Sequence, residues 1–172
     1  MPWTNVLERT LLAALVTTLL LIGPDPLEAR QGGAPESASP EAEVLATVDA
    51  LFDGMRARDG DRVLAVFHPD ARLVSTRIDD DGQPVVTTSE VAGFASAVGQ
   101  GGDPWNEPYW DPVVQVDGAL AQVWIFYRFY AGETFSHCGH NAIQLVRDAD
   151  RGWVIMSLID TRRTTDCDAP GA

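Results

Sequence analysis

The sequence predicts one α+β domain, in which N-terminal helices pack on one face of a curved antiparallel sheet. Two observations support this fold class. Apolar residues recur at helical spacing in segments that precede Gly102, whereas strand-like runs separated by turn residues fill the chain from Trp110 to Arg163. One of those turns is Asp117-Gly118, and Asp-Gly between β-rich runs is the strongest local signal of a hairpin. A chain of 172 residues has room for one domain with an ordinary core.

The first helix is expected to begin at Ser39-Pro40, which suits the N-cap and the first helical position. The apolar residues that follow are spaced by three and four, as on one buried helical face. They are Val44, Leu45, Val48, Leu51, Phe52 and Met55. Asp59-Gly60 ends this helix, and Asp61 is expected to cap a short second helix that includes Phe67. His68-Pro69 ends the second helix, because the residue before a proline avoids helical angles.

The rest of the chain consists of strands and turns with one more helix. Residues 71–78 and 84–88 predict a hairpin, and Thr88-Ser89-Glu90 opens the third helix. Residues 103–110 form an irregular connector with three aromatic side chains and two prolines. Four strands then follow as an antiparallel meander, with approximate spans 111–116, 119–130, 135–147 and 153–163.

The N-terminal segment is typical of an export signal. Twelve mostly apolar residues, Leu11 to Ile22, are followed by the break Gly23-Pro24. This run suits a cleaved signal and is short for a membrane span, although an uncleaved anchor stays open. The folded part is therefore expected in the periplasm or outside the cell. The expected segments are a signal peptide (1–29), a disordered linker (30–40), the domain (41–163) and a tail (164–172).

The charge of the chain excludes two classes of partner. The net charge is -13 at pH 7, and all basic residues are arginines. Such a chain is poorly suited to bind nucleic acid or anionic lipid. We therefore expect no nucleic-acid partner, and contact with a membrane only through an uncleaved anchor. The acidity itself is attributed to solubility.

The predicted export makes a disulfide between the two cysteines, Cys138 and Cys167, possible, because disulfides persist in oxidising compartments. Cys138 lies early in the third meander strand and Cys167 just past the fourth. A bridge between them requires the tail to fold back on the sheet, and this pairing is favoured. The alternative is a free thiol at Cys138 inside a pocket.

The second meander strand carries apolar side chains on both faces, because successive residues of a strand alternate sides. One set is Val123, Ile125, Tyr127 and Phe129, and the other is Trp124, Phe126 and Tyr130 with Arg128 among them. One face can meet the helices. For the other we expect a second copy of the protein, so a homodimer is predicted. The alternative is that a terminal segment of the same chain covers that face.

Local segments of the chain resemble the nuclear transport factor 2-like superfamily, and most closely its exported, SnoaL-like and lumazine-binding bacterial branch. These segments are Met55–Asp59, Phe67–Leu73, Val123–Phe129, Ser136–Gly139 and Gly152–Ile155. None is a catalytic signature. The resemblance implies a cone-shaped, cystatin-like α+β roll, a pocket open at one end, and frequent dimers through the sheet. The superfamily contains both enzymes and non-enzymatic binders, so fold alone does not settle function.

The candidate catalytic residues are His140, His137 and Asp160. A regular turn near Asp150 places position 140 opposite position 160, and the resemblance implies His/Asp or Tyr/Asp pairs in dehydratases and isomerases. The alternative is a structural or surface pair, or no contact at all. No metal and no cofactor are expected, because the Cys138 and His140 pair lacks further ligands. His68 is assigned to a cap and turn.

The candidate ligand-binding residues are aromatic or cationic, and not all of them can face inward. They are Trp105, Tyr109, Trp110, Trp124, Tyr127 and Arg128. The first functional hypothesis is a binder of a small, largely apolar ligand in the cone, without proven catalysis. The alternatives are an isomerase, cyclase or dehydratase that uses the His/Asp pair, and a non-catalytic dimerisation or assembly module.

Overall fold

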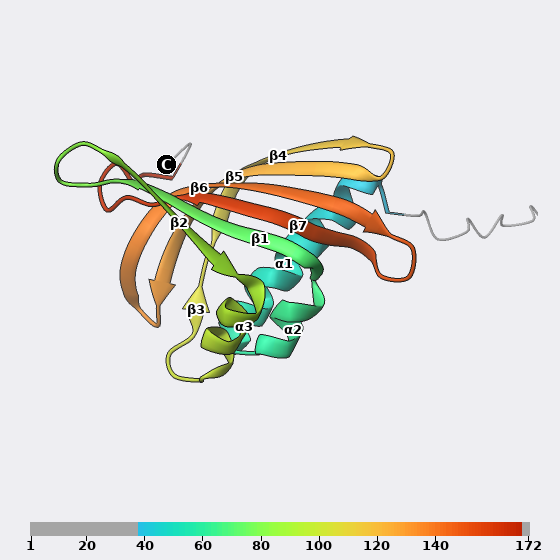
Figure 1. The fold of residues 1–172 in the computed structure, drawn as a ribbon, viewed down its shortest axis with the longest axis horizontal. Helices are drawn as coiled ribbons and strands as arrows, with labels where there is room; N and C mark the ends of the chain where they lie inside the picture. Colours follow the sequence, from blue (N-terminus) through green and yellow to red (C-terminus); the bar gives the residue numbers. More distant parts are fainter. Residues whose placement is uncertain (1–37, 170–172) are drawn as a thin grey trace, which may run out of the picture. The chain divides into compact units, whose positions relative to one another are not determined.

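The computed structural model describes residues 38–169. Its strands form one seven-stranded sheet, which bends over the helices and does not close (Figure 1). The elements are α1 (Pro40–Ala57), α2 (Gly60–Ala65), β1 (Phe67–Ile78), β2 (Pro84–Glu90), α3 (Val91–Gly99), β3 (Trp105–Asn106), β4 (Tyr109–Asp117), β5 (Leu120–Ala131), β6 (Thr134–Asp148) and β7 (Gly152–Thr161). The predicted α+β class is confirmed. The predicted signal peptide (1–29) lies outside the described residues.

The strand order is β2-β1-β7-β6-β5-β3, and β4 also pairs with β5. Every pair is antiparallel except β1 with β7, which is parallel. The four meander strands of the sequence are thus β4 to β7, and the hairpin is β1 and β2. Within residues 38–169, no helix has the combination of length and apolar character that a membrane span needs.

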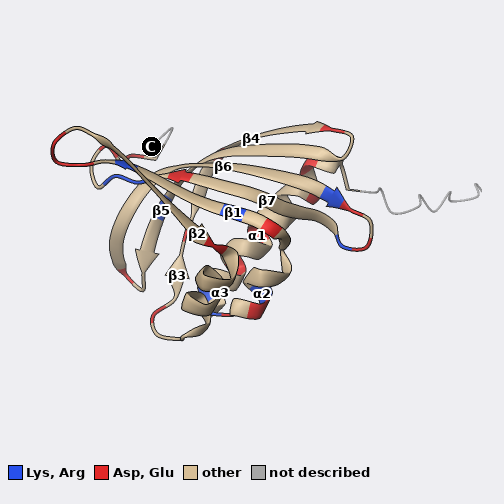
Figure 2. Ribbon diagram, in the orientation of Figure 1, with Lys and Arg blue, Asp and Glu red and all other residues tan. Residues whose placement is uncertain are grey.

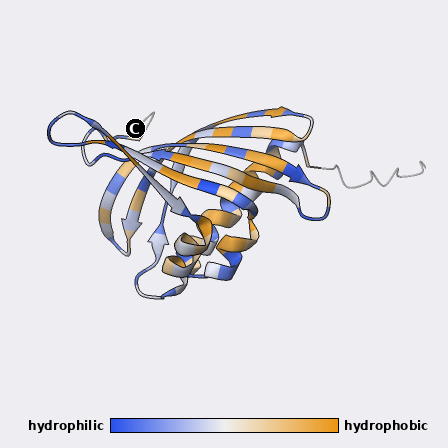
Figure 3. Cartoon of the chain, in the orientation of Figure 1, coloured by the Kyte–Doolittle hydropathy of each residue, from blue (hydrophilic) through white to orange (hydrophobic). Residues whose placement is uncertain are grey.

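Helix α1 begins as the sequence predicts. The Ser39 hydroxyl accepts a hydrogen bond from the backbone N–H of Ala42 at 3.2 Å, which satisfies one of the free donors of the first turn. Five of the six predicted apolar positions are buried, and Leu45 is partly buried against the same core. The core lies between the helices and the concave face of the sheet. Apolar and polar residues alternate along the strands above it (Figure 3).

The start of α2 differs from the prediction. Asp59, not Asp61, is the N-cap, and its Oδ1 accepts from the N–H of Arg62 at 2.9 Å. Asp59 can do so because Arg58 ends α1 in the left-handed conformation, with φ 57°, and turns the chain at once. Phe67 is the first residue of β1 rather than part of the helix. Similarly, β2 continues through Glu90, which caps α3 without a side-chain hydrogen bond.

The register between β6 and β7 also differs from the prediction by one residue. Leu145 lies opposite Ile155, and a regular ladder from that pair would place His140 opposite Asp160. The next pair is instead Gln144 with Ser157, so that β7 carries one extra residue, Met156, in a bulge. Asn141 therefore faces Asp160.

The disulfide between Cys138 and Cys167 is present, as predicted. The chain after β7 folds back along β6, where the N–H of Cys138 donates to the carbonyl oxygen of Arg163 and the N–H of Arg163 donates to that of Cys138, at 2.8 and 2.9 Å. The alternative of a free thiol at Cys138 is therefore wrong. The bridge fixes the residues between Arg163 and Cys167 beside the sheet.

Candidate functional site

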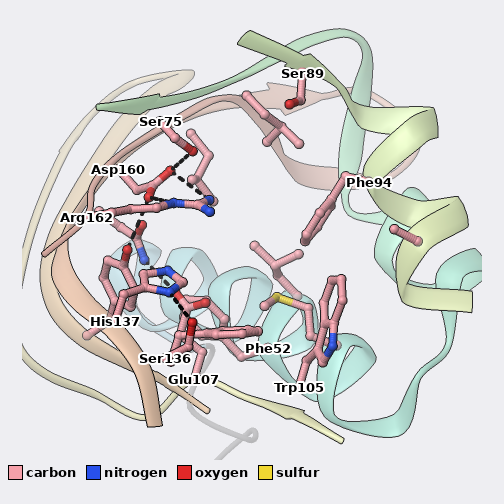
Figure 4. Close-up of a pocket in the computed structure, with 18 of the residues that line it drawn as sticks. Phe52, Ser75, Ser89, Phe94, Trp105, Glu107, Ser136, His137, Asp160 and Arg162 are labelled. Carbon is pink, nitrogen blue, oxygen red and sulfur yellow. Dashed lines mark hydrogen bonds and ion pairs between the residues drawn. The ribbon is translucent and has the colours of Figure 1, made fainter. Parts of the chain in front are cut away.

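A cavity of about 710 Å³ lies between the concave face of the sheet and the helices α1 and α3 (Figure 4). Its apolar wall comes mainly from α1 and α3, with contributions from β3 and β5. It includes Leu51, Phe52, Met55, Phe94, Trp105 and Phe129. Its polar wall comes mainly from the strands, and includes Ser75, Tyr127, His137, Asn141, Asp160 and Arg162, with Glu107 from the connector before β4. The cavity thus has an apolar side and a polar side that face each other.

Asp160 is the centre of the polar wall and is almost fully buried. The Ser75 hydroxyl donates to its Oδ1 at 2.6 Å, and Nε of Arg162 donates to its Oδ2 at 2.6 Å. The hydroxyl of Tyr127 lies 3.1 Å from the same Oδ2. Burial acts to lower the pKa of Arg162, but the hydrogen bond and charge of Asp160 outweigh it and raise that pKa. Asp160 therefore acts as a paired anion within a network.

Glu107 is a buried carboxyl group with a single hydrogen-bond partner among the described residues. The side-chain amide of Asn141 donates to its Oε1 at 2.8 Å, and both side chains are buried. Burial raises the pKa of Glu107 to about 8, although the Asn141 bond opposes this. At neutral pH the group is therefore mainly a protonated acid, which can donate a hydrogen bond into the cavity.

His137 faces the cavity from β6. Its ring stacks on Phe129 with centroids 5.1 Å apart, and its Nδ1 lies 3.0 Å from the hydroxyl of Ser136. Burial, and next to it the charge of Arg162, lower the pKa of His137 to about 4. The imidazole is therefore neutral at physiological pH, with one ring nitrogen that can accept a proton.

The structure brings His137 and Asp160 into one cavity but places His140 on the other face of the sheet. There the His140 ring stacks on Trp124, with centroids 5.0 Å apart. The expected pairing of His140 with Asp160 is wrong, because the Met156 bulge shifts the register and the two side chains lie on opposite faces.

Of the six predicted ligand-binding residues, Trp105 and Tyr127 line the cavity. The guanidinium of Arg58 lies 4.2 Å from the centre of the Trp105 ring and supports it from the other side of the cavity wall. Tyr109 is not among the lining residues, and its hydroxyl donates to Asp49 Oδ1 at 2.8 Å. Arg128 lies over Trp110, 5.5 Å from its ring centre.

Trp110, Trp124 and Arg128 are also absent from the cavity lining. Nε of Arg128 donates to the carbonyl oxygen of Cys167 at 2.6 Å, so this arginine is bound to the C-terminal segment. Within residues 38–169, no three His, Cys, Asp or Glu side chains are grouped so as to hold a metal ion.

Glu107 and Asn141 are site residues that the sequence analysis missed. One signal was present: Glu107 is an acidic residue between Trp105 and Tyr109 in the aromatic connector, where a solvated charge is unexpected. Asn141 offered no such signal, because its inward orientation depends on the register of β6.

No family model matches the chain, and no curated protein does. Solved structures do match. An NTF2-like protein of unknown function from Shewanella baltica aligns with a TM-score of 0.56 and 14% identity, over 72% of this chain and 93% of that one. An NTF2-like superfamily protein from Salmonella enterica aligns at 0.58 and 12%, over 77% and 97%. A proposed dehydratase of the NTF2-like family from Streptomyces avermitilis aligns at 0.55 and 16%, over 72% and 96%.

These likenesses show the fold. The chain has the nuclear transport factor 2-like fold, in its cystatin-like α+β form. The SnoaL-like or lumazine-binding branch and export stay predictions.

Proposed function

We propose that the protein binds a small, largely apolar molecule in the cavity between the sheet and α1 and α3. One observation carries this proposal: a space of about 710 Å³ has an apolar wall opposite a compact group of polar side chains. Ligand sites of this size are mostly apolar, with a few polar groups that fix the orientation of the ligand. The disulfide supports the further proposal that binding occurs outside the cytoplasm, where such bridges persist.

Gly93 provides a way to test the proposal without disturbing the fold. It lies in α3 at the wall of the cavity, and a Cβ built on it meets no atom within 4 Å. A phenylalanine there would enter the cavity without a clash at its first atom. Ala92 lies next to it on the same helix, is exposed, and is not part of the lining, so Ala92→Phe is a matched control.

The experiment titrates 1-aminoanthracene, a neutral aromatic fluorophore, into the protein and the two variants. We expect binding to the unmodified protein and to Ala92→Phe, and at least about tenfold weaker binding to Gly93→Phe. No binding to the unmodified protein, or equal binding to both variants, would overturn the proposal. Circular dichroism and thermal unfolding check that both variants are folded.

A second candidate function is acid–base catalysis on a ligand in the same cavity. It is favoured by the presence of a protonated Glu107 and a neutral His137 in the lining of one cavity, since opposite pKa shifts within one site assign an acid and a base. His137 would remove a proton from carbon while Glu107 donates its proton to the carbonyl oxygen, which yields an enol. The proposed dehydratase from Streptomyces avermitilis has the same fold, which is compatible with an enzyme at this site.

Deuterium exchange at C2 of 1-tetralone in D₂O, followed by NMR, tests this second candidate. We expect exchange above the buffer rate with the unmodified protein, and loss of that excess in His137→Gln and in Glu107→Gln. His68→Gln, at a histidine outside the cavity lining, is the control. Bound 1-tetralone without excess exchange would exclude this proton transfer and leave the binding function.

A further inference from the structure

A second concavity, the arginine groove, adjoins the cavity at its polar end. This groove has a volume of about 780 Å³ and lies between the end of the β1–β2 hairpin and the segment after β7. It is lined by Thr76, Arg77, Ile78, Pro84, His137, Thr161, Arg162, Arg163, Thr164 and Thr165. His137 and Arg162 line both spaces, so the two adjoin at these side chains.

The arginine groove differs in composition from the rest of the molecule. Its ten lining residues include three arginines and four threonines but no aspartate or glutamate. The whole chain, in contrast, has 25 acidic residues against 12 arginines. Figure 2 shows a basic position in β1 near the β1–β2 turn and basic positions in the segment after β7, while the tip of the β1–β2 hairpin is acidic, as are many other parts of the chain. An acid-free arginine groove in such a chain indicates a local preference for anions.

The three arginines of the groove differ in whether a carboxylate of the protein already neutralises their charge. Arg162 donates through Nε and Nη2 to Asp160, and its Nη1 has no hydrogen-bond partner within residues 38–169. Arg163 donates to the carbonyl oxygen of Asp166 and lies over Phe126 on the outer face. Arg77 is exposed, and no described carboxylate lies within 4.0 Å of its guanidinium. The charge facing the groove without a partner is therefore mainly that of Arg77.

We propose that the ligand of the cavity is an amphipathic organic acid, whose single carboxylate binds in the arginine groove between Arg77 and Arg162. The apolar body occupies the cavity, and the carboxylate passes the His137 and Arg162 boundary. Guanidinium groups are suited to this, because their planar array of N–H donors matches the two oxygens of a carboxylate. A monoanion matches one unpaired charge, since Asp160 already compensates Arg162. This inference rests on the proposed binding function and adds the chemical class of the ligand.

The test uses two fluorescent probes that differ in the charge of the head group and by one methyl group, 11-(dansylamino)undecanoic acid and its methyl ester. The variants are Arg77→Gln and the control Arg62→Gln, which removes an equal charge from α2 outside both spaces. We expect the unmodified protein to bind the acid about tenfold more tightly than the ester. Arg77→Gln should reduce the preference to about one, because the loss falls mainly on binding of the acid, while Arg62→Gln should behave like the unmodified protein.

The outcomes separate this inference from the function on which it rests. If 1-aminoanthracene binds but acid and ester bind equally, the arginine groove does not select anions and only the inference is overturned. The same holds if Arg77→Gln weakens both probes to the same extent. If neither the probes nor 1-aminoanthracene binds, the binding function itself is wrong.

Discussion

The hydroxyl of Tyr127 lies 3.1 Å from Oδ2 of Asp160 and 2.9 Å from the carbonyl oxygen of Thr161. A phenol has one proton, so the two acceptors share it, and burial followed by the charge of Asp160 raises the pKa of Tyr127 far above its usual value. With Ser75 and Arg162 also bound to Asp160, this carboxylate has little capacity left for a ligand. The network therefore holds β1, β5 and β7 together at the polar wall.

Asp160→Asn should destabilise the fold, because it removes the charge that Arg162 pairs with and weakens the hydrogen bonds from Ser75, Tyr127 and Arg162. We expect a loss of about 2 kcal/mol in the free energy of unfolding, moderated by the partial exposure of Arg162. Tyr127→Phe, which removes one hydroxyl, should cost about 1 kcal/mol. Urea unfolding measures both. Equal stability of Asp160→Asn and the unmodified protein would show that the network contributes nothing.

Glu107 predicts an unusual dependence of stability on pH. Its pKa is about 8 in the fold against an ordinary 4.5, so the unfolded chain releases this proton first as pH rises. The favourable contribution is complete below pH 4.5 and falls by roughly 1.4 kcal/mol per pH unit until about pH 8. Glu107→Gln keeps an acceptor for Asn141 and removes the titration. Its unfolding free energy should fall less between pH 5 and 8 than that of the unmodified protein. Parallel curves would mean that Glu107 is ionised in the fold.

His137 predicts the opposite trend at lower pH. Its pKa is about 4 in the fold against 6.5 in the unfolded chain, so its contribution is present above pH 6.5 and is lost as pH falls towards 4. NMR titration of the imidazole ring protons, assigned by comparison with His137→Gln, should give a midpoint well below 6.5. A titration midpoint near 6.5 would show that the His137 ring is exposed to solvent rather than buried.

The disulfide should stabilise the fold and also order the arginine groove. It joins residues 29 apart, and closing a loop of that length is worth about 3–4 kcal/mol on the chain-entropy model. The double variant Cys138→Ser, Cys167→Ser should lose that amount in guanidinium unfolding. It should also bind the dansyl acid more weakly, because Thr164 and Thr165 lie inside the closed loop. A double variant that matches the unmodified protein in both measurements would contradict this.

The outer face of the sheet leads us to expect a homodimer. Val113, Trp124, Ala142 and Ile159 lie side by side across β4 to β7, and the large members are 55%, 48% and 42% exposed. Such a row favours burial against a second copy. Trp124→Arg should shift the sedimentation coefficient to that of a monomer, whereas Leu64→Arg, at an exposed apolar site on α2, should not. An unmodified protein that is monomeric at high concentration would overturn the expectation.

Local signals predicted those parts of the fold that depend on local physics. Ser39 and the apolar spacing after it identified α1, and Asp117-Gly118 identified the β4–β5 turn. The residues of β5 could also be assigned to two opposite faces, because successive side chains of any strand point to alternate sides of the sheet.

The predictions that were wrong or incomplete concern features that depend on contacts between residues far apart in the sequence. The Met156 bulge has no signature in the sequence, yet it decides that Asn141 rather than His140 faces Asp160. The raised pKa of Glu107 arises from its burial beside Asn141 of β6, and the aromatic residues on either side of Glu107 in the sequence are only a weak signal of that burial. Trp110 and Trp124 were reasonable candidates for a pocket, but only the assembled sheet decides which face encloses the cavity.

Trp105 gives the protein a built-in optical reporter. Of the tryptophans between residues 38 and 169, it is the one that lines the cavity, beside Phe94 and Phe129. An occupant that stacks on its indole will alter its emission without any added dye, and Trp105→Phe will abolish that response. Crude extracts can therefore be screened, fraction by fraction, for the natural occupant.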